Sequence, residues 1–232
     1  MPLTRLGTPH VVLMCATLAL GLAVDVRTGI GGQIAIGAVF WGVLFYMLRR
    51  VEARERQALV ACLAIATAAE LFLSLAWGLY RYRLDNVPLF VPPGHVLMFL
   101  LGTFLARRVH ERVAWAVFAG AVAYGLAAAA GGWDTLSLLF LAMIVVSWIA
   151  APRERRLLAS TFVLALGLEF YGTWLGTWAW SHSVPVTGWT TTNPPGVSGA
   201  LYSTLDALVA ASTALLARAD RRIVGCVSPP SA

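Results

Sequence analysis

The chain has 232 residues, of which 59% are hydrophobic and 12% are charged, and its mean hydropathy is +0.76. This composition excludes an ordinary soluble domain and indicates an integral membrane protein with a single domain. All 17 basic residues are arginines, and they form short clusters between apolar runs. Such clusters are topology signals, so the net charge of +6 does not predict nucleic-acid binding.

The first half of the chain contains four apolar runs. A helix that crosses a membrane needs roughly 20 mostly apolar residues. We expect such helices at residues 8–24, 30–48, 58–80 and 94–106. The fourth run is short, follows Pro92-Pro93-Gly94 and has His95 at its start. Arginine-rich loops at 49–56 and 107–112 follow the second and fourth runs.

The second half repeats this alternation. We expect spans at 113–130, 135–151, 157–180 and 198–217, with basic loops at 153–156 and 218–222. The fold predicted is therefore an all-α, polytopic bundle of eight transmembrane helices, followed by a flexible tail at 223–232. Seven spans is the alternative, because the first and fourth runs are the weakest. None of the three cysteines, at positions 15, 62 and 226, belongs to a disulfide or metal motif.

The arginines also predict an orientation. Eight spans place both termini on one side of the membrane, and 14 of the 17 arginines then fall on that side. Arginine is enriched in cytoplasmic loops. We therefore expect a protein of the plasma (inner) membrane with both termini in the cytoplasm.

Two parts of the chain resemble each other. Arg54-Glu55-Arg56 recurs as Arg153-Glu154-Arg155, and Glu70 recurs as Glu169, both 99 residues later. Each of these two glutamates is followed by glycine and aromatic residues, an outer proline and a Pro-Pro-Gly sequence. This order predicts two parallel four-helix repeats, at about 8–112 and 113–222. Coincidence is the alternative, since Pro-Pro-Gly is a natural helix entry.

Three acidic residues lie inside apolar spans, namely Glu70, Glu169 and Asp206. A carboxyl group is costly to place there, so each is expected to be functional. Small and polar residues lie three and four positions away on the same helix faces, which leaves room beside each acid. We predict that the three acids converge on one cavity, where a carboxylic acid is a candidate proton donor. Hydrogen bonding to a neighbouring helix is the alternative role.

Aromatic side chains accompany these acids and would stabilise positive charge on a substrate. The candidate substrate-binding residues are Trp77, Tyr80, His95, Tyr171, Trp174, Trp178 and Tyr202. The alternative for tryptophan near span ends is the interfacial belt, which we favour for Trp133, Trp180 and Trp189. His95 has the alternative role of a structural cap. No closely spaced His/Glu signature is present, so we expect neither a metal nor a cofactor.

Two family resemblances follow from these residues. Glu169-Phe170-Tyr171-Gly172, with Gly176 to Trp180 and a proline loop behind it, resembles carotenoid-biosynthesis membrane hydratases over roughly 30 residues. The overall plan resembles small integral-membrane terpene cyclases, which use one early Glu and one late Asp as acids; Glu70 and Asp206 match by position. Leu73 departs from the glycine of the first pattern. The resemblance implies an isoprenoid substrate.

The leading expectation is thus an integral membrane enzyme that acts on a lipid or isoprenoid by carboxylic-acid catalysis in an aromatic-lined cavity, as a cyclase or hydratase. Its partners would be the bilayer and a hydrophobic small molecule. A proton-coupled transporter is one alternative, because repeats and midplane carboxylates suit it equally well. A non-catalytic membrane subunit or assembly factor is the other.

Overall fold

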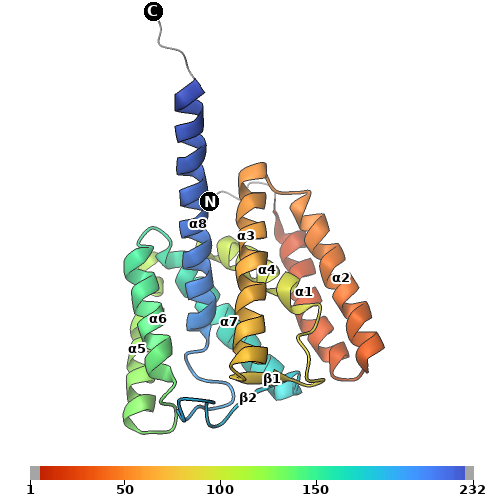
Figure 1. Cartoon of the computed structure of the whole chain (residues 1–232), viewed down its shortest axis with the longest axis vertical. Coiled ribbons are helices and arrows are strands. Elements are labelled where there is room, and N and C mark those ends of the chain that lie inside the picture. The colour runs from red at the N-terminus through yellow and green to blue at the C-terminus, as the bar shows by residue number, and fades with distance from the viewer. Residues whose placement is uncertain (1–5, 228–232) are drawn as a thin grey trace, which may run out of the picture.

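The computed structural model describes the backbone of residues 6–227 and the side chains of residues 6–216. Within these residues the regular secondary structure is helical apart from two short strands, and loops connect the elements, so the predicted all-α class is confirmed (Figure 1). The elements are α1 (Thr8–Asp25), α2 (Ile30–Leu48), α3 (Ala53–Glu70), the π-helix η1 (Leu71–Ala76), β1 (Tyr80–Tyr82), α4 (Val91–Ala106), α5 (Glu111–Ala130), α6 (Ser137–Ala150), α7 (Arg155–Leu175), β2 (Trp178–Trp180) and α8 (Gly199–Val227).

Six helices in the described part of the chain are long and apolar enough to cross a membrane. They are α1, α2, α3 with η1, α5, α7 and α8. The helices α4 and α6 have 16 and 14 residues. At 1.5 Å per residue they measure about 24 and 21 Å, less than a hydrocarbon core of about 30 Å. The chain is therefore membrane-like, whereas the count of eight spans stays a prediction.

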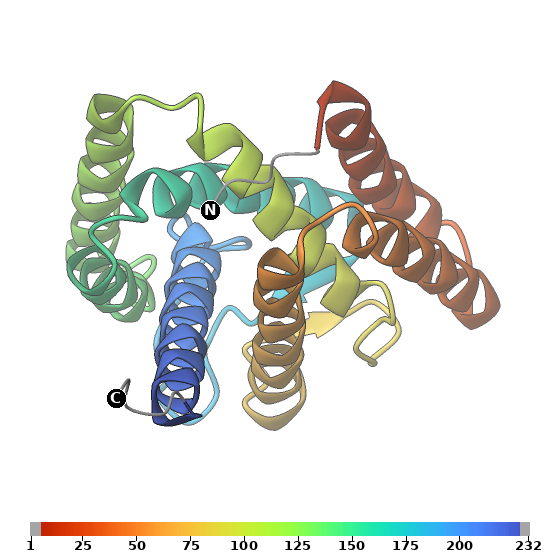
Figure 2. The same cartoon turned by 90° about the horizontal axis from the view of Figure 1, so that it is seen from above.

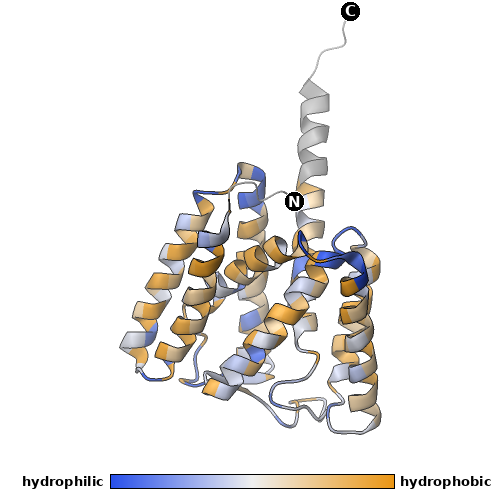
Figure 3. Cartoon of the chain, turned by 180° about the vertical axis from the view of Figure 1, so that it is seen from behind, coloured by the Kyte–Doolittle hydropathy of each residue, from blue (hydrophilic) through white to orange (hydrophobic). Residues whose placement is uncertain are grey.

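The outward faces of the helices are apolar. Val39 on α2, Ile149 on α6 and Leu215 on α8 are 59%, 71% and 63% exposed. Hydrophobic colours run along the helices, and hydrophilic colours gather at the loops (Figure 3). An apolar surface of this extent suits contact with lipid.

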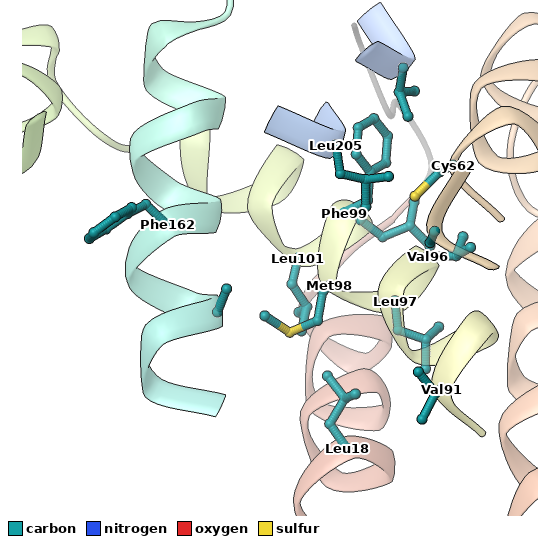
Figure 4. Close-up of a cluster of buried hydrophobic side chains, with 14 of the residues drawn as sticks. Leu18, Cys62, Val91, Val96, Leu97, Met98, Phe99, Leu101, Phe162 and Leu205 are labelled. Carbon is teal, nitrogen blue, oxygen red and sulfur yellow. The ribbon is translucent and has the colours of Figure 1, made fainter. Parts of the chain in front are cut away.

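Four helices form the centre of the bundle. Seen from above, α3, α4, α7 and α8 lie between the pair α1 and α2 on one side and the pair α5 and α6 on the other (Figure 2). Residues 96–101 of α4 are all buried, which is typical of a helix surrounded by protein. Their side chains belong to one apolar cluster with Leu18, Cys62 and Leu205 from three other helices (Figure 4).

The two ends of the bundle differ in character. The strands lie at one end, with the α1–α2 and α5–α6 loops; we call this the strand end (Figure 1). The other end carries the loops at 49–52, 107–110 and 151–154; we call it the arginine end. At the arginine end α8 continues to Val227, so residues 223–227 of the predicted tail are helical. Residues 228–232 lie outside the described part.

Two expected helices end earlier than predicted. The runs 58–80 and 157–180 were expected to be helical throughout, but α-helix and π-helix stop at Ala76 and α-helix stops at Leu175. Gly78 and Gly176 follow with φ of +72° and +80°. Such left-handed residues, usually glycine, terminate helices, because other residues carry a Cβ penalty there. The aromatic residues beyond each glycine therefore form strands.

Candidate functional site

Glu70 is the last residue of α3, and the chain after it folds back over its carboxylate. The hydroxyl groups of Tyr80 and Tyr82 in β1 both donate to Oε2 of Glu70, at 2.8 and 2.7 Å. Side chains alternate along a strand, so these two tyrosines share one face while Arg81 between them is exposed. Glu70 itself is 6% exposed.

Glu169 on α7 is held in the same manner by β2. The indole N–H groups of Trp178 and Trp180 donate to its Oε2 at 2.8 and 2.9 Å. The glutamate is 5% exposed and the two indoles 8% and 6%. Indole nitrogen donates and cannot accept, so Oε2 of Glu169 carries no proton.

The two strands pair with each other and join these half-sites. β1 and β2 are antiparallel, with Tyr80 opposite Trp180 and Tyr82 opposite Trp178. The ring centroids of Tyr80 and Trp180 are 4.9 Å apart. All four aromatic side chains therefore form one layer, and this layer covers both carboxylates at the strand end.

A difference of one residue between the half-sites has a structural cause. Gly78 lies eight residues after Glu70, whereas Gly176 lies seven residues after Glu169. The extra residue falls in η1, and a π-helix accommodates one additional residue per turn. The two glycines and the two strands therefore take corresponding places. The predicted duplication requires this correspondence, but the duplication itself stays a prediction.

His95, in the first turn of α4, contacts the other oxygen of Glu70. Its Nδ1 lies 3.1 Å from the carbonyl oxygen of Val91, which can only accept, so Nδ1 carries a hydrogen. Its Nε2 lies 3.3 Å from Oε1 of Glu70. Two facing lone pairs would repel, so one proton is shared between Glu70 Oε1 and His95 Nε2.

Tyr202 on α8 links the two glutamates. Its ring stacks on His95 with a centroid separation of 4.9 Å and an interplanar angle of 7°. Its hydroxyl group interacts with Glu169. Glu70 and Glu169 are themselves close enough to interact electrostatically. Among the side chains that the structure describes along the two lobes, His95 is the one basic group, so a state with both carboxylates ionised is poorly compensated.

Two pockets that share wall residues lie against this site, and we call them the two lobes of the cavity. The smaller lobe, of about 40 Å³, is walled mainly by α1, α2 and α4. The larger lobe, of about 200 Å³, lies between α3, η1, α6 and α8. The remaining walls of both lobes are chiefly apolar. The residues that line both lobes are Glu70, Tyr80, His95, Glu169 and Tyr202.

Asp206 does not line this cavity, contrary to the expectation of a single chamber for all three acids. It lines a separate pocket of about 1050 Å³ at the arginine end. Asp206 follows Tyr202 by four residues on α8, which moves it about 6 Å along the helix axis. The tilt and direction of α8 therefore separate it from the two glutamates.

Several predicted aromatic residues have other roles in the structure. The indole of Trp77 donates to the carbonyl oxygen of Pro185 at 3.0 Å, and Tyr171 donates to that of Ala19 at 2.9 Å. Trp174 is 79% exposed. None of these three lines either lobe. Tyr80, His95, Trp178 and Tyr202 do line the cavity.

Sequence reasoning missed two residues that contact the acids. Trp180 was assigned to the interfacial belt, but it is 6% exposed and bonded to Glu169. Tyr82 was not proposed at all. The signal was the alternation Tyr-Arg-Tyr and Trp-Ala-Trp after a glycine, which indicates a strand with both aromatics on one face. Extending the helices over these residues concealed it.

The buried phenols of β1 are strong candidates for permanent hydrogen-bond donors. Burial raises the pKa of Tyr80 and of Tyr82 well above the ordinary value of a phenol, and the nearby Glu70 adds to the rise. Within the described residues, no group of three or more His, Cys, Asp or Glu side chains is arranged to hold a metal ion. No protein-family model, curated protein or solved structure matches the chain.

Proposed function

We propose that the chain is an integral membrane enzyme that acts on an isoprenoid-type lipid by carboxylic-acid catalysis. The supporting observation is the pair of buried glutamates, each with one oxygen held by two aromatic donors, on a shared apolar cavity. Burial of two acids costs considerable free energy, and acids retained at such cost within membrane helices are commonly functional. Proton transfer to and from an apolar substrate is the purpose that fits the surroundings.

The donors assign different roles to the two acids. Phenols donate and accept, and their hydroxyl hydrogens rotate, so Tyr80 and Tyr82 tolerate Glu70 with or without its proton. Indoles only donate, so Trp178 and Trp180 favour the carboxylate form of Glu169. Glu70, which shares its proton with His95, is therefore the general acid, and Glu169 is the general base.

The reaction balances without a further reactant. The proton shared by Glu70 and His95 is transferred to one carbon of a substrate double bond, which forms a C–H bond and leaves a carbocation on the other carbon. Aromatic faces of Tyr80, Trp178 and Tyr202 stabilise this cation. Loss of a proton from a neighbouring carbon to Glu169 then gives an isomerised product, and attack of a second double bond on the cation before that loss closes a ring and gives a cyclised product. Hydration instead takes water as a second reactant, which bonds to the cation and gives up a proton to Glu169.

A lipid substrate reaches the larger lobe from the side. Phe72 on η1 and Leu208 on α8 belong to the lobe wall and are 57% and 50% exposed. Both side chains are apolar, and they lie on helices that suit a bilayer. A hydrocarbon chain enters between them without crossing water. The apolar walls then exclude water from the cation.

Deuterium uptake from heavy water tests this proposal directly. Reversible protonation labels a substrate carbon even when the product is unknown. Membranes containing the protein are incubated with a panel of acyclic isoprenoids in D₂O, and the extracted lipids are analysed by mass spectrometry. We expect labelling to fall at least about 100-fold in Glu70→Gln and in Glu169→Gln, the scale of a lost general acid or base. Glu111→Gln, on the exposed first turn of α5, is the control.

Two outcomes would contradict the proposed enzyme. Equal labelling in wild type and both glutamine variants would overturn acid catalysis by this pair. Labelling absent in wild type, with all acids dispensable to the cell, would favour the non-catalytic subunit. Each variant is first checked for retained folding by thermal unfolding in detergent.

A proton-coupled carrier is the second candidate function. Its support is the arginine-end pocket, which is lined by Asp206, a residue one helical turn after Tyr202 on α8. Flux of a solute driven by a pH gradient in vesicles, lost in Glu70→Gln, would favour it over the enzyme. For either function, we further propose a bundle of two four-helix repeats with the arginine end and both termini facing the cytoplasm of the plasma (inner) membrane.

A further inference from the structure

Asp206 is a buried acid for which the proposed reaction has no use. It is 1% exposed, and neither of its oxygens has a hydrogen-bond partner among the described residues. The hydroxyl of Thr161 on α7 lies near it but is also without a hydrogen-bond partner there. An unsatisfied buried carboxyl group is costly, so water or a transferable proton is expected beside it.

The pocket that Asp206 lines runs to the arginine end. Along α8 its wall is formed by Asp206, Ala210 and Ala214, which follow one another at a spacing of four on one helix face. This wall is about 12 Å long. The alanines leave space, and the outer part is lined by Arg54, Arg153 and Arg156. A pocket of about 1050 Å³ with so many polar groups holds water.

One helical turn on α8 separates Asp206 from Tyr202, and two turns on α7 separate Thr161, near Asp206, from Glu169. Tyr202 lies four residues before Asp206, lines both lobes and interacts with Glu169. On α7, Thr161, Ala165 and Glu169 also share one face at a spacing of four. Ala165 between them is fully buried and contributes only a methyl group. The stretch from Asp206 to Glu169 is therefore about two helical turns long and is bounded by small or polar side chains.

The other sides of the site offer no polar groups through which a proton could pass from water to the described glutamates. At the strand end the four aromatic residues of β1 and β2 are at most 8% exposed. The remaining walls of the lobes are chiefly apolar, and the larger lobe faces the lipid. The arginine-end pocket is the described route on which an ionisable group lies between water and the site.

We propose that Asp206 is the proton port of the site and exchanges protons between water in the arginine-end pocket and Glu169. After Glu169 has removed a proton from the substrate, it passes that proton to the hydroxyl of Tyr202, which releases its own toward Asp206, and Asp206 releases a proton to water; uptake of a proton follows the reverse order. This inference rests on the proposed function, since a port is needed only where the glutamates exchange protons. The other ionisable groups that face Asp206 or line its pocket are Cys62, Glu52, Glu55, Glu154, Arg54, Arg107, Arg153 and Arg156.

A pH jump followed by infrared spectroscopy tests the port without a substrate. The full chain in lipid nanodiscs is shifted from neutral to acidic pH, and the carbonyl stretch of protonated carboxyl groups is recorded with time. Bands lost in Glu70→Gln and Glu169→Gln identify the site. We expect Asp206→Asn to slow the response of these bands at least tenfold, and Asp206→Glu to restore it.

Two further variants make the test specific. Ala210→Phe fills the pocket one turn from Asp206 and leaves the acid in place, so it should also slow the response. This variant keeps the test usable if Asp206→Asn does not fold. Asp134→Asn is the matched control, because Asp134 is fully buried, has no hydrogen-bond partner for either oxygen among the described residues and lies at the strand end. It should respond at the wild-type rate.

The outcomes separate this inference from the proposed function. Wild-type rates in both Asp206→Asn and Ala210→Phe, with the glutamate bands still visible, would overturn the port and leave the site intact. Bands that persist unchanged in Glu70→Gln and Glu169→Gln would contradict the site itself, and the port with it.

Discussion

At the scale of single residues, the nature of the donors distinguishes two otherwise equal carboxyl groups. Both glutamates are about 5% exposed and accept two hydrogen bonds on one oxygen. The phenols beside Glu70 can also accept, and the indoles beside Glu169 cannot. The proton therefore has a place at Glu70 that it lacks at Oε2 of Glu169.

Removal of one indole donor tests this distinction. Trp180→Phe keeps an aromatic ring but removes a hydrogen bond to a charged group, which is worth about 1.5–3 kcal/mol. We expect the free energy of unfolding in detergent and denaturant to fall by that amount. Trp189→Phe, in the loop between β2 and α8 where the residue is 38% exposed, should change it by less than about 0.5 kcal/mol. Equal effects would contradict a charged Glu169.

The two tyrosines of β1 predict an alkaline limit to stability. Their pKa values are raised in the folded protein, whereas the unfolded chain has ordinary phenols of pKa about 10. The unfolded state therefore loses protons first as pH rises. Below about pH 10 both phenols make their full contribution to the free energy of unfolding. Between that pH and the raised pKa of the folded protein, the free energy of unfolding falls by about 1.4 kcal/mol per tyrosine and pH unit.

Unfolding measured at about pH 9 and about pH 11 checks this expectation. Wild type should lose more stability between these values than the double variant Tyr80→Phe/Tyr82→Phe. Tyr124→Phe is the control, because Tyr124 is 43% exposed. If the double variant loses as much as wild type, the tyrosines are not the groups that titrate.

At the scale of elements, helix ends rather than helix interiors build the site. A glycine with positive φ stops η1 and α7 at the same level, and three-residue strands then turn their aromatic side chains back toward the acids. Gly172 permits this on α7, because a Cβ at that position would lie 2.0 Å from the ring of Trp178. The indole can approach the helix this closely because glycine has no side chain.

Two glycines of the same helix provide a matched test. Gly172→Ala forces the indole of Trp178 away from Glu169, and we expect a loss of about 1–3 kcal/mol in unfolding free energy. A Cβ at Gly167 would have no neighbouring atom within 4 Å. Gly167→Ala should therefore be neutral or stabilising by up to about 1 kcal/mol. A neutral Gly172→Ala would mean that the indole does not pack on the helix as described.

At the scale of the whole molecule, charge and hydropathy divide the bundle along its axis. Arg54, Arg107, Arg153 and Arg156 line one pocket at the arginine end. The strands and the loop around Val186, which is 99% exposed, lie at the other end. Basic loops orient a membrane protein with those loops on the cytoplasmic side, so the arginine end is expected in the cytoplasm.

Labelling of single cysteines tests this orientation. In a chain without its three native cysteines, Val186→Cys should react with a membrane-impermeant maleimide added to intact cells. Arg153→Cys should react only after the membrane is permeabilised. The reverse pattern would invert the proposed topology, and labelling of both sites in intact cells would mean mixed insertion.

The sequence alone determined the membrane-like class and the main helices, and it drew attention to Glu70 and Glu169. These follow from local properties: long apolar runs require helices in lipid, and a carboxyl group within such a run is conspicuous. The positions of helix ends were less accurate, because the aromatic residues after Gly78 and Gly176 are as apolar as the helices before them.

Only the tertiary structure decided which polar groups meet. Strand pairing brings Trp180 and Tyr82 to the acids, although the pairing joins residues about 100 positions apart. The path of α8 takes Asp206 out of the glutamate cavity and into the arginine-end pocket. Hydropathy along a chain measures the cost of burying a side chain, whereas helix packing and strand register determine what that side chain touches once it is buried.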